Sequence, residues 1–332
     1  MPGHDIGMHA IEVSETGGPE VLSYNDVSQP EPGPGELLIR SEAIGVNFID
    51  TYFRSGQYPR PLPFVLGSEV CGTVSAVGPD TGGDINVGDR VVSASANGSY
   101  AEFCTAPAFL TAKVPDDISS EVAASALLKG LTAQYLLKSV YPVRSGDAVL
   151  VHAGAGGVGL ILTQWATHLG ARVITTVSTP EKERLSREAG AAEVLPYPAD
   201  AYQFGQQIRG LTDGAGVAVV YDGVGASTFA ASLASLANHG TLALFGAASG
   251  PVPPFDPQQL NYAGSVYLTR PSLAHFIRTG EEFSSRAAEL FDVIGSGAVR
   301  VEVGRSYPLA EATRAHTDLE GRKTTGSVVL LP

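Results

Sequence analysis

The feature that most constrains the fold of this chain is a glycine-rich turn between a strand-like run and a helical run. Residues 149–161 read VLVHAGAGGVGLI, in which Gly154, Gly156 and Gly159 match G-x-G-x-x-G, and a helical pattern continues to Gly170. In this setting the glycines permit a tight turn, a close approach of the backbone to a pyrophosphate, and close packing of the helix on the strand. The pattern therefore predicts a dinucleotide-binding βα unit.

The segments around this turn alternate between apolar strand-like runs and helical runs. Over residues 147–270 the strand-like runs lack a regular polar alternation, and helical stretches separate them, among them STFAASLASLANHG at 227–240. Strands of this kind are buried on both faces, as in a parallel sheet covered by helices. We therefore expect a doubly wound parallel-sheet domain of the Rossmann type at residues 123–270.

The two ends of the chain have a different pattern. Residues 10–115 carry short β-type runs separated by turn residues, and the chain closes on the strand-like run GSVVLLP. A final strand of this kind more often completes a sheet than stands alone, so we expect it to join the first segment. The predicted fold class is thus α/β, with a mostly β domain at residues 1–122 and 271–332 beside the Rossmann domain.

Composition excludes several kinds of partner. Among 332 residues, 21 are Lys or Arg and 34 are Asp or Glu, which gives a net charge of -13. Such a surface disfavours nucleic acid and anionic membranes as main partners, so an anionic cofactor must be attracted locally. Residues 1–7 look like a loose polar tail without a leader pattern, and the only cysteines, Cys71 and Cys104, lie in apolar strand-like runs. We expect a cytoplasmic chain whose cysteines are buried and unreactive.

The strand after the glycine turn indicates which dinucleotide is bound. An NAD site normally presents an Asp or Glu to the ribose 2'-hydroxyl about 20 residues after the turn. Residues 175–180 are neutral instead, and Lys182 follows in the expected first turn of the next helix. A 2'-phosphate needs donors and positive charge, which Ser178, Thr179 and Lys182 supply. The sequence therefore predicts NADPH, although Glu181 lies beside Lys182 and the alternative for Lys182 is a solvated helix residue.

Several segments spread over residues 8–332 resemble one family. They are GVNFIDTYFRSGQYP at 45–59, AASALLKGLTAQYLL at 123–137, the glycine turn, VYDGVG at 220–225, LFGAASG at 244–250, YLTRPSL at 267–273 and EGRKTTGSVVLLP at 320–332. Together they are similar to the zinc-independent quinone oxidoreductases, the zeta-crystallin-like branch of the medium-chain dehydrogenases and reductases. The resemblance implies a GroES-like β domain built from both ends of the chain around the Rossmann domain. It also implies NADPH-dependent quinone reduction in the cleft between the domains, and a homodimer formed through the edge strand SVYLTR.

Carried over by position, the resemblance also implies which residues form the site. Asn47 and Tyr52 would lie beside the nicotinamide and act on the substrate, which Tyr58 and Thr132 would also contact. The cofactor would be bound by Asn47, Lys129, Gly130, Thr132, Gly154, Gly156, Gly157, Val158, Gly159, Ser178, Lys182, Tyr197, Phe245, Gly246 and Arg322. The resemblance also adds Tyr197 and Arg322 to the ribose end, which the bare sequence does not single out.

The residues at the expected reaction site argue against zinc. The zinc-dependent branch has a cysteine and a G-H-E segment where this chain has Asn47 and Gly67-Ser68-Glu69, and no cysteine cluster or H-x-x-x-H spacing occurs. Without a metal to lower an alcohol pKa, an electron-poor acceptor such as a quinone or an activated alkene is expected. Such an acceptor needs the nicotinamide C4 within about 3–3.5 Å and a hydrogen-bond donor near the oxygen that gains charge. Asn47 and Tyr52 are the candidate donors, and the alternative for Tyr52 is a packing role.

Three functions stay open on the sequence. The first is an NADPH:quinone reductase that transfers hydride or single electrons. The second is an NADPH-dependent reductase of activated C=C bonds in enals, enones or enoyl thioesters. The third is an NADPH-binding regulatory or structural protein with negligible turnover.

Overall fold

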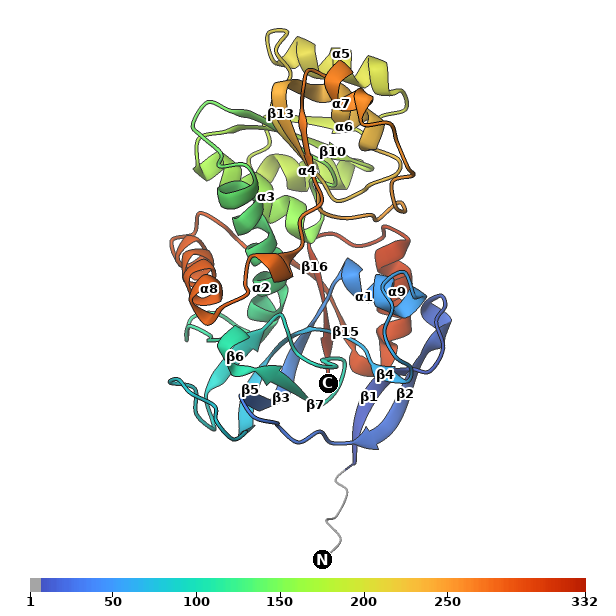
Figure 1. Cartoon of the computed structure of the whole chain (residues 1–332). Helices are drawn as coiled ribbons and strands as arrows, with labels where there is room; N and C mark the ends of the chain where they lie inside the picture. Colours follow the sequence, from blue (N-terminus) through green and yellow to red (C-terminus); the bar gives the residue numbers. More distant parts are fainter. Residues whose placement is uncertain (1–6) are drawn as a thin grey trace, which may run out of the picture. The chain divides into compact units, whose positions relative to one another are not determined.

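The computed structural model describes residues 7–332, so nearly all of the expected polar tail at residues 1–7 lies outside it. The chain forms two compact units (Figure 1). Unit 1 contains the chain up to Lys129 together with Ile277–Phe291 and Val301–Pro332, and unit 2 contains Gly130–Phe276 and Asp292–Arg300. The domain bounds given above stay a prediction.

Unit 1 is built on two β-sheets. The smaller has the strand order β2 (Leu22–Ser28), β1 (Gly7–Val13) and β4 (Phe64–Val65). The larger has the order β15 (Val303–Pro308), β16 (Ser327–Leu331), β3 (Glu36–Val46), β5 (Glu69–Val77), β6 (Arg90–Ser93) and β8 (Thr111–Lys113), with β7 (Phe103–Pro107) paired to β3. The closing strand β16 pairs antiparallel with β3 (Figure 1), which confirms that the end of the chain completes the first sheet.

Helices and short turns complete unit 1. Its helices are α1 (Phe48–Ser55) and α9 (Ala312–Glu320), and α2 (Ser120–Tyr135) and α8 (Gly280–Gly295) each begin in it and end in unit 2. Helix α2 continues in unit 2 as a π-helical turn over Leu136–Val140. 3₁₀ turns occur in unit 1 at Pro19–Val21, Ala108–Leu110 and Leu309–Glu311, and in unit 2 at Leu273–His275. The core between these elements includes Ile39, Ile44, Leu66, Val70 and Tyr100, each fully buried.

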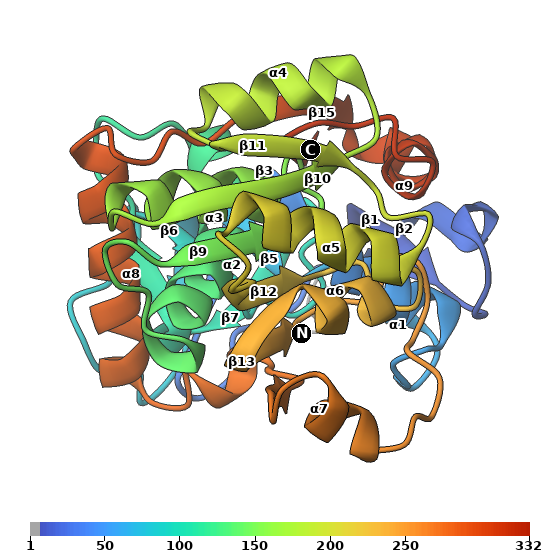
Figure 2. The same cartoon turned by 90° about the horizontal axis from the view of Figure 1, so that it is seen from above.

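Unit 2 is a six-stranded parallel sheet. Its strand order is β11 (Glu193–Pro196), β10 (Arg172–Val177), β9 (Ala148–Val151), β12 (Val217–Asp222), β13 (Leu236–Leu244) and β14 (Tyr267–Thr269), and Figure 2 shows the first five side by side. The chain enters the sheet at β9, builds outward to β11, and then returns to place β12 on the other side of β9. This order is that of a Rossmann sheet, whose ligands bind where the direction of building reverses. The glycine turn follows β9 at that point, so the fold places it where a dinucleotide is expected.

Five helices of unit 2 connect these strands, and they are α3 (Gly157–His168), α4 (Pro180–Glu188), α5 (Ala201–Leu211), α6 (Phe229–Ser235) and α7 (Gln258–Tyr262). Helices α5 and α6 pack against each other (Figure 2). Val149, Leu150 and Val151 of β9 are fully buried, as the apolar runs predict. In the part of the chain that the structure describes, no helix has the length and apolar character needed to cross a membrane.

One predicted helix is too long. The helical pattern at residues 227–240 suggests a single helix, but α6 ends at Ser235 and β13 begins at Leu236. The main chain of Leu236 pairs with Val217 of β12, and the register then shifts before Thr241 pairs with Val219. Because fully buried Leu236 satisfies its backbone in the sheet, this tertiary pairing overrides the local helical spacing.

Candidate active site

The glycine turn has the geometry that close packing requires. Gly156 has extended backbone angles and precedes α3, whose first two residues are Gly157 and Val158. A Cβ on Gly159 would lie 2.1 Å from the Ala153 carbonyl oxygen, and one on Gly154 would lie 2.5 Å from Thr175 Cβ. Helix N-termini leave their first N–H groups without partners inside the helix, and these groups bind phosphate. A turn with this close packing and a helix start behind it fits a pyrophosphate.

A buried carboxylate shapes the neighbouring loop at the end of β12. Asp222 is fully buried, and its Oδ1 accepts hydrogen bonds from the main-chain N–H of Val224 at 2.8 Å and of Gly225 at 3.0 Å. Thr228 and Ser232 donate their hydroxyls to its Oδ2 at 2.8 and 2.7 Å. The loop that follows β12, next to the glycine turn's strand, is therefore held by several bonds to one side chain. The sequence reasoning missed Asp222, and an acid ending an apolar strand was the available signal.

The residues after β10 that are predicted to bind the ribose end of the cofactor lie close together at the start of α4. Ser178 follows β10, and Thr179 caps α4 by accepting a hydrogen bond from the Lys182 main-chain N–H at 3.2 Å. The Lys182 ammonium donates to the Ser178 hydroxyl at 3.4 Å, so the two predicted phosphate ligands lie together. Glu181 is engaged elsewhere, because Arg184 binds it at 2.7 Å and holds the pKa of its carboxyl below the usual value. A cation beside a hydroxyl fits a 2'-phosphate.

Six more of the predicted cofactor residues lie in three places. Tyr197 directly follows β11, and Phe245 and Gly246 follow β13, so these residues all lie at the carboxyl edge of the parallel sheet. The N–H of Phe245 donates to the Asp222 carbonyl at 2.8 Å. Gly130 and Thr132 lie on the part of α2 that belongs to unit 2, whereas Arg322 is an exposed residue of unit 1 after α9. The roles of all these residues stay predictions.

In unit 1, Asn47 is locked between a cation and a carboxylate. Lys129 Nζ donates to Asn47 Oδ1 at 2.7 Å, and Asn47 Nδ2 donates to Glu69 Oε2 at 2.8 Å. All three side chains are buried, with exposed fractions of 4% for Asn47, 6% for Lys129 and 0% for Glu69. Since an ammonium only donates, it fixes which end of the amide faces it. These contacts use one of the two Nδ2 hydrogens of Asn47.

Glu69 is held firmly at the base of this group. Its Oε1 accepts the main-chain N–H of Leu128 at 2.8 Å, and Lys129 Nζ lies 3.6 Å from its Oε2. Burial raises the pKa of the Glu69 carboxyl, and Lys129 and the Asn47 bond oppose that rise. A Cβ on Gly45 would lie 2.3 Å from Glu69 Oε2 and 2.3 Å from the Ala124 carbonyl, so only glycine leaves room for this carboxylate. The G-S-E segment noted in the sequence was the signal for Glu69, but its partners depend on the fold.

Tyr52 and Tyr58, two further residues predicted to meet the substrate, also lie together. Tyr52 is a buried residue of α1, and the ring centroids of the two tyrosines are 5.3 Å apart in an edge-on arrangement. The main-chain N–H of Tyr58 donates to the Tyr52 carbonyl at 3.0 Å. Within unit 1 the structure thus brings Asn47 together with Lys129, and Tyr52 together with Tyr58.

A second buried group, which the sequence did not predict, includes Asp50 and Arg54 of α1. Asp50 Oδ2 accepts the Asn47 main-chain N–H at 2.8 Å and the Tyr100 hydroxyl at 3.0 Å. His316 contacts Tyr100 through Nε2 at 3.0 Å and Arg54 through Nδ1 at 2.9 Å. Burial raises the pKa of Asp50 to about 7, whereas burial and the Arg54 charge lower that of His316 to about 3. The spacing Asn47-x-x-Asp50, a capping-box pattern, was the signal for Asp50.

The described residues hold no metal-binding cluster. Across residues 7–332, no group of three or more His, Cys, Asp or Glu side chains has the arrangement of a metal site. Cys71 and Cys104 are buried, as predicted, and burial raises the pKa of each thiol to about 12. A thiol this hard to ionise is a poor nucleophile and a poor metal ligand.

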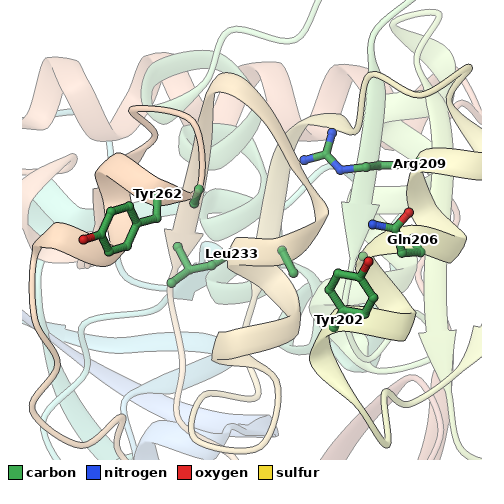
Figure 3. A pocket seen from close by; sticks show the side chains of 8 residues that line it. Tyr202, Gln206, Arg209, Leu233 and Tyr262 are labelled. Carbon is green, nitrogen blue, oxygen red and sulfur yellow. The ribbon is translucent and has the colours of Figure 1, made fainter.

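A cavity of about 280 Å³ lies elsewhere on unit 2, between α5, α6 and α7 (Figure 3). Tyr202, Gln206, Arg209, Leu233 and Tyr262 are among its lining residues. None of the predicted site residues lines it. The Arg209 guanidinium is already bonded to the carbonyls of Ala215 and Leu236, each at 3.0 Å. We therefore assign the cavity no part in the site.

Comparison with known proteins agrees with this fold. The family model described as "Alcohol dehydrogenase GroES-like domain" matches residues 33–116, and the one described as "Zinc-binding dehydrogenase" matches residues 157–292. The fold class is therefore confirmed as a GroES-like β domain with a Rossmann domain, the architecture of medium-chain dehydrogenases and reductases.

The individual relatives are more specific. A quinone oxidoreductase of Pseudomonas aeruginosa is 48% identical over 97% of this chain and 99% of its own, and a 2-haloacrylate reductase of Burkholderia is 41% identical over 97% and 98%. Among solved structures, a mycobacterial protein in complex with NADPH is 78% identical with a TM-score of 0.96, over 98% of this chain and all of its own. An Escherichia coli quinone oxidoreductase in complex with NADPH is 44% identical with a TM-score of 0.94 over the same shares.

This chain belongs to the quinone oxidoreductase family of the medium-chain dehydrogenases and reductases. It is an oxidoreductase, which removes the non-catalytic alternative considered from the sequence. The family relationship that the sequence motifs indicated is thereby confirmed.

Proposed function

We propose that this chain reduces quinones with NADPH, by direct transfer of a hydride or of electrons and without a metal. The observation that carries the proposal is the Asn47 amide, locked between Lys129 and Glu69 at the position where the zinc-dependent branch has a metal ligand. A fixed amide donor in a buried setting serves an acceptor that is already electron-poor. The assignment of NADPH rests on the Lys182 and Ser178 pair and on the NADPH held by two of the related structures.

Each side chain of the site has a defined task in this reaction. When bound, NADPH supplies a hydride from C4 of its dihydronicotinamide. Lys129 donates to Asn47 Oδ1 and polarises the amide, so the Nδ2 hydrogens become stronger donors. Glu69 accepts one of these hydrogens, and the other is proposed to donate to the acceptor oxygen that gains negative charge. The quinol anion formed by hydride transfer then takes a proton from water or through Tyr52.

The second candidate is reduction of an activated C=C bond, and one observation favours it. The Burkholderia relative, named as a 2-haloacrylate reductase, is 41% identical over nearly the whole chain. The same Asn47 donor would stabilise an enolate oxygen as well as a quinol oxygen, so the site chemistry accommodates both acceptors. Quinones remain the first candidate, and the higher identities of the quinone oxidoreductases, 48% and 44%, support this choice.

A panel of acceptors tests the proposal. NADPH oxidation is measured with 1,4-benzoquinone, 1,4-naphthoquinone, a 2-alkenal, 2-chloroacrylate and an enoyl thioester, and each assay is repeated with NADH. We expect the highest kcat/KM with the quinones and a clear preference for NADPH. A higher kcat/KM with any of the alkenes would replace the first candidate with the second.

The homodimer and the cytoplasmic location are part of the same proposal. Strand β14 is the last strand of the six-stranded sheet, and Tyr267 on it is 64% exposed. An edge strand with exposed apolar surface is suited to pairing with a second copy. The two free cysteines suit a reducing compartment. Light scattering of Tyr267→Lys against wild type tests the dimer, since an unchanged mass would reject β14 as the interface.

A further inference from the structure

The buried group that includes Asp50 and Arg54 of α1 forms a continuous line of hydrogen bonds within unit 1. It runs from Arg54 through His316 and Tyr100 to Asp50, and each of these side chains is at most 2% exposed. Arg54 also binds Glu320 with two bonds of 2.8 Å each. The line therefore ties α1 to α9 and to Tyr100, which precedes β7. None of these residues takes part in the chemical steps proposed above.

The donors and acceptors along this line can have only one direction. A guanidinium only donates, so His316 Nδ1 must accept from Arg54. The neutral imidazole then carries its hydrogen on Nε2 and donates it to the Tyr100 oxygen. The hydroxyl hydrogen of Tyr100 is left to Asp50, so every bond points toward the carboxylate. The neutral state of His316 agrees with its pKa, which burial and Arg54 lower to about 3.

We propose that Asp50 is a positioning residue for the reaction, and that its carboxylate, oriented by this line of bonds, holds the Asn47 main chain at the start of α1. The same carboxylate oxygen accepts from both Tyr100 and the Asn47 N–H. Because Asn47 caps α1 and Tyr52 lies about one turn further along the same short helix, the carboxylate fixes the segment that presents both side chains. The inference rests on the proposed function.

The charge state of Asp50 makes the positioning sensitive to pH. Burial is the largest influence and raises its pKa to about 7, with a further rise from Glu69 on β5. Lys129 on α2, the Tyr100 hydroxyl and the Asn47 N–H oppose that rise. The remaining charged or titratable groups of the line are Arg54, His316 and Glu320. A neutral carboxyl accepts hydrogen bonds less strongly than a carboxylate, so protonation near pH 7 loosens the hold on Asn47.

The activity test compares two tyrosine variants. The rate of NADPH oxidation with 1,4-naphthoquinone is measured from pH 5.5 to 8.5 in wild type, Tyr100→Phe and Tyr307→Phe. Tyr307 is the matched control because its buried hydroxyl donates to Asp318 at 2.7 Å and is not part of the line. We expect kcat to fall on the acid side with a midpoint near 7 in wild type and in Tyr307→Phe.

In Tyr100→Phe the carboxylate loses a donor, so the acid limb should move upward by about one pH unit, with little change in the KM for NADPH. A purely structural role would lower the rate at all pH values and leave the midpoint where it is. Equal midpoints in Tyr100→Phe and wild type would overturn the proposal, as would a wild-type kcat that does not change across this range.

A second measurement follows the wild-type protein directly and needs no turnover. The Asp50 carboxyl carbon and the Asn47 main-chain amide are followed by NMR through the same pH range, with Asp50→Asn used for assignment. We expect both signals to titrate with one midpoint near 7. An Asn47 amide that does not respond while Asp50 titrates, or an Asp50 that titrates below pH 5, overturns the proposal. Absence of quinone turnover in every variant would instead reject the proposed function, and the NMR result would still decide the positioning.

Discussion

At the scale of single residues, Lys182 and Ser178 are the proposed ligands at the adenine end of the cofactor site. Their contact at 3.4 Å is a pairing that residue types and strand position could predict. The bond that draws Glu181 to Arg184 was not predictable, because it depends on which way two long side chains turn on a helix surface. The hydrogen bonds that fix the Asn47 amide were likewise not predictable, since Glu69 and Lys129 are 22 and 82 residues away along the chain.

The first prediction concerns the choice between cofactors. Lys182→Ala should weaken NADPH binding by about tenfold to a hundredfold, because a charge-assisted contact to the 2'-phosphate is lost, and should leave NADH binding unchanged. Fluorescence titration of both cofactors measures this. The control is Arg187→Ala, which removes a cation of the same helix that is paired with Glu183. Equal losses for NADPH and NADH would contradict the role of Lys182.

Tyr52 provides the second prediction. In Tyr52→Phe the hydroxyl that can relay a proton or donate a hydrogen bond is removed, while the ring that packs against Tyr58 stays. We expect kcat with a quinone to fall and NADPH affinity to be preserved. A steady-state assay and a binding titration measure the two quantities. If kcat is unchanged, Tyr52 only packs the wall of the site.

The third prediction concerns stability and Asp50. Its pKa is raised, to about 7, so in the native state it keeps a proton that the unfolded chain has already lost at lower pH. The contribution of Asp50 to the free energy of unfolding is highest at acid pH, where both states are protonated, and it falls as the pH rises toward and through 7. Relative to Asp50→Asn, the free energy of unfolding of the wild type should therefore fall by up to about 4 kcal/mol between pH 4 and pH 8. Denaturant unfolding of both proteins at several pH values measures this difference. A wild type that becomes more stable than Asp50→Asn as the pH rises would contradict the prediction.

At the scale of elements, the strand-turn-helix unit around the glycine turn was fully visible in the sequence. The end of α6 was not, because the pairing of Leu236 with β12 is a tertiary contact that local spacing does not encode. The start of α1 lies between these cases. Its Asn-x-x-Asp pattern is readable, but the partners that orient Asp50 come from residues 100 and 316.

The glycine turn provides the fourth prediction. Gly159→Ala places a Cβ 2.1 Å from a carbonyl oxygen and should destabilise unit 2 by about 1–3 kcal/mol. Gly156→Ala is the matched control, since its Cβ would lie 3.3 Å from the same oxygen, which is a tight but adjustable contact. Denaturant unfolding followed by the fluorescence of Trp165, the single tryptophan, reports on α3 directly. Equal stability of the two variants would show that the turn accommodates a Cβ at Gly159 and would contradict the prediction.

At the scale of the whole molecule, alternation of strands and helices was enough to predict a Rossmann sheet between two segments of a second β unit. The return of β16 to β3 followed from the closing strand-like run. What no pattern revealed is the buried polar group that joins the first hundred residues to α9, because Tyr100 and His316 are 216 residues apart in the sequence. Hydrophobic periodicity positions elements, whereas the hydrogen bonds between distant elements appear only once the chain has folded.

The central claim is that electrons pass from NADPH to a quinone without a metal. The most direct test is a single-turnover experiment with chelator-treated protein whose zinc content has been measured, loaded with NADPH and mixed rapidly with 1,4-naphthoquinone. We predict oxidation of the nicotinamide at the full rate, with no increase when zinc is added. Oxidation that appears only after zinc is restored would contradict the claim.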